Sequence, residues 1–262
     1  MKIYLGSRNI KPEGFKTLDI SPECNPDIVA DITHMPQITD ESCTELIASH
    51  VLEHLCWPES FRAMAEMARI LKVGGILKIA VPDLGILLEI MKSQGMPFFA
   101  AGMIFGQGTG SNFHDQHHYG FTAEMLLPIL KFLGFSDFDW WNSTLAEGAN
   151  GWYSVGQEKI AVSLNIKAVK KHNPSCDTGR IYELLEKNPM KEFRQIIAME
   201  TASEIDDEQI SEPMLYQRIH FKEDVKSFSF FIKKCTSKVV SGFWGILHFR
   251  GTFLFRHSVH LI

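Results

Sequence analysis

The chain contains 262 residues, of which 45% are hydrophobic and 22% charged, and its net charge is −5 at neutral pH. This length and apolar content suffice to bury a core for one full α/β domain plus an extension. The acidic balance argues against a general nucleic-acid-binding protein, which normally carries a basic excess. The five cysteines are scattered without a CxxC pair, so we expect reduced thiols rather than a disulfide framework or a zinc site. The opening KIYLG is strand-like and unlike a secretory signal, so we expect a cytoplasmic protein.

Residues 1–170 alternate short apolar runs with helical stretches, which is typical of a mostly parallel sheet covered by helices. A helix is predicted from Pro58 to residue 71, because apolar side chains recur every three or four residues, and Gly74-Gly75 is predicted to end it. Before that helix, strands are predicted at residues 3–5, 17–20, 28–32 and 46–49.

The alternation continues with a strand at 76–81 and a helix that runs to about Met91. Residues 105–120 are rich in glycine and histidine and cannot hold a long regular element. A helix at 122–133 is predicted to end at Gly134. Two closing strands, at 135–141 and 159–166, complete a seven-stranded, mostly parallel Rossmann-like sheet with helices on both faces.

The ends of the predicted strands carry residues suited to a ligand, because ligands of such sheets bind beyond the carboxyl ends of the strands. Gly6 after the first strand allows close approach to the backbone. The carboxylate of Asp19 can accept two ribose hydroxyls, and that of Asp31 can accept an adenine amino group. Each aspartate taken alone has an alternative explanation, since aspartates at strand ends often only cap loops or helices.

The segments that carry these residues are LGS, PEGF, LDI, VADI, SHVLEHL and RILKVGGILKIAVPDL, in that order. Over about residues 2–140 they resemble small class I S-adenosylmethionine-dependent methyltransferases of the type 11 group, which are associated with polysaccharide and lipopolysaccharide gene clusters. The resemblance implies a Rossmann-like fold and S-adenosylmethionine as the cofactor. A nicotinamide-dependent enzyme is the weaker alternative, because G-x-G-x-x-G is absent and the interval from Gly6 to Asp19 is short.

The resemblance also implies cofactor-binding positions. The methionine end would lie against Gly6, Ser7 and Ser49, the ribose against Asp19 and Ile20, and the adenine against Asp31 and Ile32.

Arg8 is a departure, because the family's second glycine falls there. An arginine must avoid a positive φ or accept strain of about 1 kcal/mol or more. Its guanidinium is also a candidate partner for the cofactor carboxylate. Two functions therefore remain open: a methyltransferase acting on oxygen or nitrogen of a sugar, glycan precursor or related small metabolite, and a catalytically degenerate module for binding or scaffolding.

Histidines supply the candidate general bases. By the resemblance, the stretch that contains His114 and His118 lies where such enzymes build the acceptor pocket, and His50 lies beside the expected cofactor pocket. An imidazole titrates near neutral pH and can accept a proton during methyl transfer. The alternatives are a solvated loop and a metal site; the loop offers two ligands but no third, so no metal is predicted. Glu53 and His54 are expected to bridge the loop to neighbouring backbone.

Residues 171–262 are predicted to form a helical extension with its own role, because an acidic stretch at 180–212 precedes a basic one at 221–262. Residues 225–255 combine aromatic side chains on one helical face with lysines opposite. This pattern predicts either a peripheral contact with the inner face of the membrane or packing against the first domain or a second subunit. Residues 239–255 are too short and interrupted to span a membrane.

Overall fold

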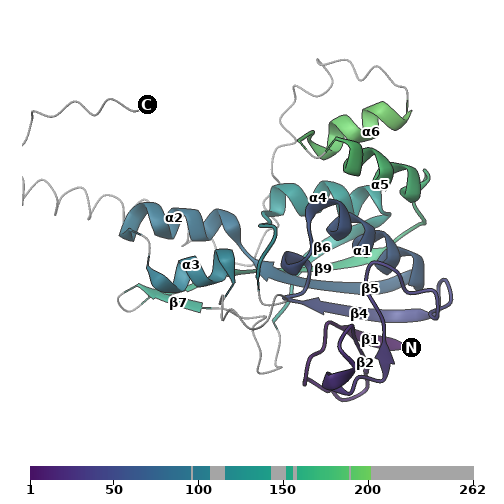
Figure 1. The fold of residues 1–262 in the computed structure, drawn as a ribbon, viewed down its shortest axis with the longest axis horizontal. Helices are drawn as coiled ribbons and strands as arrows, with labels where there is room; N and C mark the ends of the chain where they lie inside the picture. The colour runs from purple at the N-terminus through teal and green to yellow at the C-terminus, as the bar shows by residue number, and fades with distance from the viewer. Residues whose placement is uncertain (96, 107–115, 143–151, 156–157, 189, 202–262) are drawn as a thin grey trace, which may run out of the picture. The chain divides into compact units, whose positions relative to one another are not determined.

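The computed structural model describes residues 1–95, 97–106, 116–142, 152–155, 158–188 and 190–201, which belong to one compact unit. A seven-stranded sheet forms its centre, in the order β3-β2-β1-β4-β5-β9-β6 (Figure 1). The strands of this sheet are β1 (Lys2–Leu5), β2 (Lys16–Asp19), β3 (Ile28–Val29), β4 (Cys43–Ser49), β5 (Leu71–Pro82), β6 (Phe135–Trp140) and β9 (Ser163–Lys170). A separate hairpin pairs β7 (Trp152–Val155) with β8 (Glu158–Ala161).

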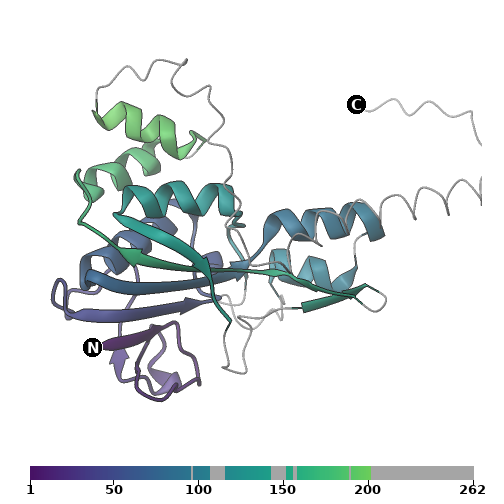
Figure 2. The ribbon, with the colours of Figure 1, turned by 180° about the vertical axis from the view of Figure 1, so that it is seen from behind.

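The helices of the described residues are α1 (Trp57–Ile70), α2 (Leu84–Gln94), α3 (Phe98–Phe105), α4 (Ala123–Phe132), α5 (Thr178–Lys187) and α6 (Phe193–Thr201), with single 3-10 turns η1 (Pro22–Cys24) and η2 (Leu52–His54). Figures 1 and 2 show α1, α4, α5 and α6 stacked on one side of the sheet, while α2 and α3 lie beyond the end toward which β4 and β5 point. None of these helices is long and apolar enough to cross a membrane.

The topology is that of a doubly wound sheet. Strands β3, β2, β1, β4 and β5 run parallel, and β9 is antiparallel to both of its neighbours, β5 and β6. The chain crosses from β1 outward to β2 and β3, and then returns to the other side of β1 as β4. This reversal puts the topological switch point at the carboxyl ends of β1 and β4, where ligands of such folds bind. The predicted mostly parallel Rossmann-like sheet is confirmed, but among the described residues helices cover one face of it, whereas helices on both faces were predicted.

Helix α1 ends earlier than the glycine pair predicted. It stops at Ile70, and β5 begins at Leu71, so Gly74 (φ 81) sits within an irregularity of β5 where the register against β4 shifts. Two carbonyl groups at the helix end, those of Ala68 and Leu71, instead accept hydrogen bonds from Nζ of the fully buried Lys170 of β9, at 2.6 Å each. A cation that binds the last carbonyls also complements the helix dipole, and no local sequence signal announces it.

The other predicted boundaries differ little, except at the closing strand. Helix α4 spans nearly all of 122–133, and Asp83 caps the helix that follows the predicted strand 76–81. The apolar run 159–166 is divided at Val162 between the hairpin strand β8 and the sheet strand β9. The sheet therefore closes with 163–170, four residues later than the run that was predicted.

The core lies mainly between the sheet and the helices of its covered side. Helices α5 and α6 contribute the buried side chains Ile181, Leu185 and Ile196 to this same core. Phe193 of α6 packs its ring 5.5 Å from the rings of both Phe61 and Phe132. The described residues beyond position 170 thus extend the hydrophobic core of the preceding domain. Residues 225–255 lie outside the described residues.

Candidate active site

The loop after β1 is tightly constrained by the segment that follows β4. Gly6 has a φ of +64°, and a Cβ atom there would lie 2.5 Å from Cγ2 of Val51. Both the backbone conformation and the space therefore require glycine. The N–H of Ser7 then donates to the carbonyl of Leu18 at 3.1 Å, which ties this loop to β2. The loops after β1 and β4 consequently meet at the switch point.

Arg8 adopts the left-handed conformation that the family's glycine would take, with a φ of 46°. Its backbone N–H donates to Oδ2 of Asp19 at 2.7 Å, and the N–H of Ser21 donates to Oδ1 of the same carboxylate at 2.9 Å. Arg8 was predicted either to avoid a positive φ or to accept strain. The structure shows the second outcome, and the loop keeps the turn that a glycine would make. The buried Asp19 carboxylate is thereby held in a fixed position at the end of β2, and each oxygen retains capacity to accept a further hydrogen bond.

The residues around β3 take different roles. Oδ1 of Asp31 accepts hydrogen bonds from both the backbone N–H and the hydroxyl of Thr33, each at 2.8 Å, so this aspartate does stabilise its own turn. The Asp31 residue is nevertheless exposed. Ile20 is 54% exposed, whereas the side chain of Ile32 is buried in the core. A contact of Ile32 with a cofactor would therefore fall to its backbone.

Two buried serines provide a test of whether a polar cofactor fits here. The hydroxyl oxygens of Ser7 and Ser49 are both buried and have no hydrogen-bond partner among the described residues. They follow or end adjacent parallel strands, since β1 pairs with β4 through Leu5 and Ala48. A buried hydroxyl without a partner costs about 1–3 kcal/mol. The polar methionine end of S-adenosylmethionine would supply such partners, so the residues present fit this cofactor.

His50 has a partner at each ring nitrogen. Its Nδ1 lies 3.0 Å from Oε1 of Glu53, and its Nε2 lies 3.2 Å from Oγ of Ser163. Glu53 is 1% exposed; burial alone would raise its pKa, but the hydrogen bond from His50 and nearby imidazole charge lower the pKa below the usual value. This network fixes the loop after β4. The predicted catalytic role of His50 stays a prediction.

A small cavity lies beyond the end of β5. Its volume is about 190 Å³, and its lining includes Leu84, Met103, Phe105, His117, His118 and Tyr119. Of the predicted bases, His118 is exposed at this cavity and His114 lies outside the described residues. His117 is half-buried, its Nδ1 donates to the carbonyl of Met103 at 2.9 Å, and burial lowers its pKa.

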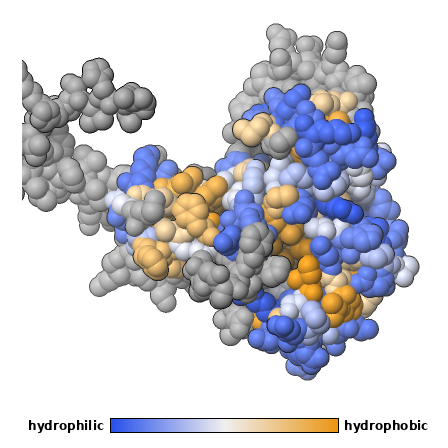
Figure 3. Space-filling view, viewed as in Figure 1, coloured by the Kyte–Doolittle hydropathy of each residue, from blue (hydrophilic) through white to orange (hydrophobic). Residues whose placement is uncertain are grey.

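Apolar side chains gather over α2 and α3, beside this cavity, as Figure 3 shows. Leu88, Phe98 and Phe105 are among the exposed large apolar residues of these helices. A second and wider cavity, of about 990 Å³, lies near the amino ends of β4 and β5. It is lined by charges that pair with one another, such as Arg69 with Glu66 and Asp40, and also by Thr33.

Two acidic residues of the site were not predicted. Asp83, at the carboxyl end of β5, has its pKa raised by burial to about 6, and the nearby Glu124 adds to this. Its signal in the sequence was the same as that of Asp19, an aspartate directly after an apolar strand. Glu53 was expected only to bridge the loop to backbone, and its burial cannot be seen in the sequence.

The chain is similar to known proteins in part of its sequence and in its structure. Residues 11–79 match the family described as "Methyltransferase domain". A SAM-dependent methyltransferase from Thermotoga maritima is 18% identical, with a TM-score of 0.42 over 65% of this chain and 82% of that one. A second, from Archaeoglobus fulgidus, is 17% identical, with a TM-score of 0.44 over 64% and 85%. No curated protein matches the sequence.

The fold is of the class I, Rossmann-like type. The family match, together with this topology, supports an S-adenosylmethionine-dependent methyltransferase, with S-adenosylmethionine as its cofactor.

Proposed function

We propose that this protein transfers the methyl group of S-adenosylmethionine to an oxygen or nitrogen atom of a sugar, glycan precursor or related small metabolite. The acceptor would enter the cavity beyond β5, whose volume of about 190 Å³ suits a small molecule and whose lining offers imidazole groups. When bound, the cofactor supplies an electrophilic methyl group on a sulfonium. The protein's contribution is then to position the acceptor in line and to accept its proton.

The observation that carries this proposal is the conformation of Arg8. The alternative, a degenerate module that no longer binds the cofactor, would follow from a collapsed first loop. Instead the arginine takes φ 46°, and its N–H orients the carboxylate of Asp19. Strain of about 1–2 kcal/mol at such a residue persists only where the surroundings impose it, and it concentrates at functional sites.

His118 is the described residue that we propose as the general base. It is exposed and lines the cavity, and its own backbone N–H donates to the carbonyl of Glu53 at 2.8 Å. That hydrogen bond fixes the segment against η2, so the imidazole is attached to an anchored backbone. His114 and His50 remain further candidates on the basis of the sequence.

Calorimetry with S-adenosylmethionine and S-adenosylhomocysteine tests the cofactor part of the proposal. We expect both to bind, and we expect Asp19→Ala to weaken binding by at least about tenfold, because it removes a buried acceptor of ribose hydroxyls. Glu183→Gln, on the exposed side of α5, is the matched control and should bind like the natural protein. Absence of binding by the natural protein would reject the enzyme and favour the scaffold.

The acceptor part requires a separate assay. Full-length protein with labelled cofactor would be incubated with panels of free sugars, nucleotide sugars and small amines, and methylated products identified by mass. We expect transfer to a hydroxyl or amine, and slower transfer by His118→Ala with cofactor binding unchanged. Transfer only to carbon, or only to a macromolecule, would refute the proposed acceptor class.

A further inference from the structure

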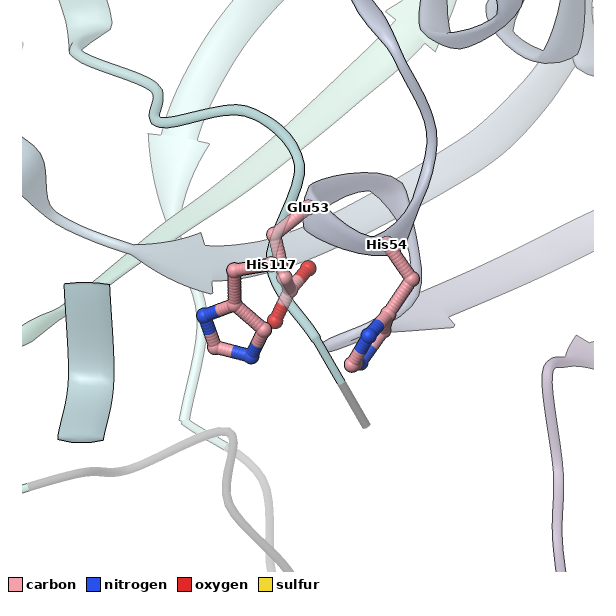
Figure 4. Close-up of side chains that lie close together, drawn as sticks. All are labelled: Glu53, His54 and His117. Atoms are coloured by element: carbon pink, nitrogen blue, oxygen red, sulfur yellow. The ribbon is translucent and has the colours of Figure 1, made fainter. Parts of the chain in front are cut away.

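Three side chains that can bind a metal converge beside the proposed acceptor cavity. One potential ligand atom from each of Glu53, His54 and His117 lies within 4.8 Å of the other two. Figure 4 shows the carboxylate of Glu53 between the two imidazole rings. Glu53 and His54 come from η2, after β4, whereas His117 comes from the segment that precedes α4. The cluster therefore joins two regions that are far apart in the sequence.

The backbone holds these two regions together. The N–H groups of His118 and Tyr119 both donate to the carbonyl of Glu53, at 2.8 Å and 3.2 Å. The N–H of His117 donates to the carbonyl of Phe105 at 3.2 Å. The convergence of the three side chains is thus set by anchored main chain on both sides, and not by the chance approach of long side chains.

Both imidazoles are oriented so that one nitrogen remains for a ligand bond. Nδ1 of His54 lies 3.0 Å from the carbonyl of Gln116, and Nδ1 of His117 lies 2.9 Å from the carbonyl of Met103. A carbonyl can only accept, so Nδ1 carries the proton in each ring. In the neutral imidazole Nε2 then has its lone pair available. Metal-binding histidines usually have this arrangement, with the second nitrogen donating to a carbonyl or carboxylate.

The carboxylate of Glu53 is incomplete without a further partner. Its Oε1 accepts from Nδ1 of His50 at 3.0 Å, but Oε2 is buried and has no hydrogen-bond partner among the described residues. A buried, charged oxygen without a partner is costly. The rings of His54 and His117 meet edge-on, with centroids 4.8 Å apart. This ring contact does not provide a hydrogen-bond partner for Oε2 of Glu53, and it does not explain why potential ligand atoms of all three residues lie within 4.8 Å of one another.

We propose that Glu53, His54 and His117 bind a divalent first-row transition-metal ion, such as Zn²⁺, Mn²⁺ or Fe²⁺, and leave coordination positions open toward the acceptor cavity. Two imidazoles with one carboxylate suit these ions, whereas Mg²⁺ and Ca²⁺ prefer sites made of oxygen ligands. Bond lengths of about 2.0–2.1 Å in a tetrahedral site require ligand atoms about 3.3 Å apart. The three ligand atoms lie within 4.8 Å of one another, so side-chain rotation toward a common centre is needed to bind the ion.

The ion's role toward the acceptor rests on the proposed function. His117 belongs both to the cluster and to the lining of the cavity, so an acceptor oxygen bound there can occupy an open coordination position. A metal ion lowers the pKa of a bound hydroxyl, whose proton passes to water or to a neighbouring base. The ion would thereby turn a weakly nucleophilic sugar hydroxyl into a better methyl acceptor.

Metal binding is tested on the full-length protein, stripped with chelator and titrated separately with ZnCl₂ and MnCl₂ by calorimetry. We expect one ion per chain for at least one of the two metals. His54→Ala and His117→Ala should each weaken that binding by at least about tenfold, since even outer partners of ligands contribute this much. His34→Ala and His172→Ala remove imidazoles outside the cluster and should bind as the natural protein does.

Thermal melting with and without metal gives a second readout that does not depend on activity. The natural protein should melt at a higher temperature with the metal, because a ligand that binds only the folded state stabilises it. His54→Ala should fold, because this residue is only half-buried, and should lose that increase. The proposal would be overturned if the natural protein bound neither metal at one ion per chain. It would also be overturned if His54→Ala and His117→Ala both bound the metal as tightly as the natural protein does. Cofactor calorimetry without metal is separate, so metal binding and methyltransferase function can fail independently.

Discussion

Replacing Asp83 by asparagine tests the electrostatics at the carboxyl end of β5. Asp83 is the N-cap of α2, where its Oδ1 accepts the N–H of Ile86 at 3.2 Å. Burial raises its pKa from an ordinary value of 3.8 to about 6, with Glu124 adding to the effect while backbone hydrogen bonds oppose it. Asparagine keeps an oxygen that can cap the helix but cannot ionise. The variant therefore separates the charge from the cap.

The direction in which stability changes with pH follows from the raised pKa of Asp83. Because the folded protein binds this proton more tightly than the unfolded chain, the resulting stability is fully present below pH 3.8 and is lost as the pH rises through about 6. A difference of about 2.2 between the two pKa values, at 1.36 kcal/mol for each pH unit, gives at most about 3 kcal/mol. Asp83 keeps some solvent exposure, so we expect about 1–3 kcal/mol after screening.

Urea unfolding of both proteins at pH 4, 5, 6 and 7.5 measures this difference. Asp83→Asn should match the natural protein near pH 4 and exceed it by about 1–3 kcal/mol at pH 7.5. Asp139→Asn, at an exposed aspartate of β6 that pairs with Lys167, is the matched control and should not gain stability at pH 7.5. A stability difference that is the same at every pH would refute the reasoning, since it would arise from packing or capping and not from titration.

Three further predictions concern the cofactor loop, the core and the C-terminal region. Gly6→Ala should lower the free energy of unfolding by about 1–3 kcal/mol in urea melts and abolish cofactor binding, because the added Cβ would clash with Val51. Gly14 has a similar φ but open space around it, so comparison with Gly14→Ala isolates the effect of the clash. Phe193→Ala should cost about 2–4 kcal/mol by calorimetric melting, because the ring packs among core aromatics, whereas Phe98→Ala, at a 95% exposed position, should cost little. If residues 225–255 contact membranes, the full chain should co-sediment with anionic liposomes and a chain ending at residue 220 should not; equal behaviour would exclude this contact.

The architecture could be predicted because its signals are local. Alternation of apolar runs with amphipathic stretches predicted the Rossmann-like sheet, and the aspartates at strand ends marked the edge that carries the candidate site. The arginine at position 8 predicted either a loop that avoids a positive φ or a strained turn, and the structure has the strained turn, with a φ of 46°. The cap of a helix was less predictable: α1 ends at Ile70, and the carbonyls of Ala68 and Leu71 are bound by Lys170 from a distant strand.

The sequence by itself determined the class of fold and the edge of the sheet where a ligand of such a fold would bind, since each depends on residues a few positions apart. The resemblance to methyltransferases, and not this spacing, implied the cofactor. Only the tertiary structure decided how the histidines are used. In the structure both ring nitrogens of His50 have hydrogen-bond partners, and His117, from a distant segment, lies beside Glu53 and His54. The pairing of segments so far apart depends on backbone hydrogen bonds to the carbonyl of Glu53. Such bonds carry no side-chain signature, so the sequence could not indicate that His117 lies beside Glu53 and His54.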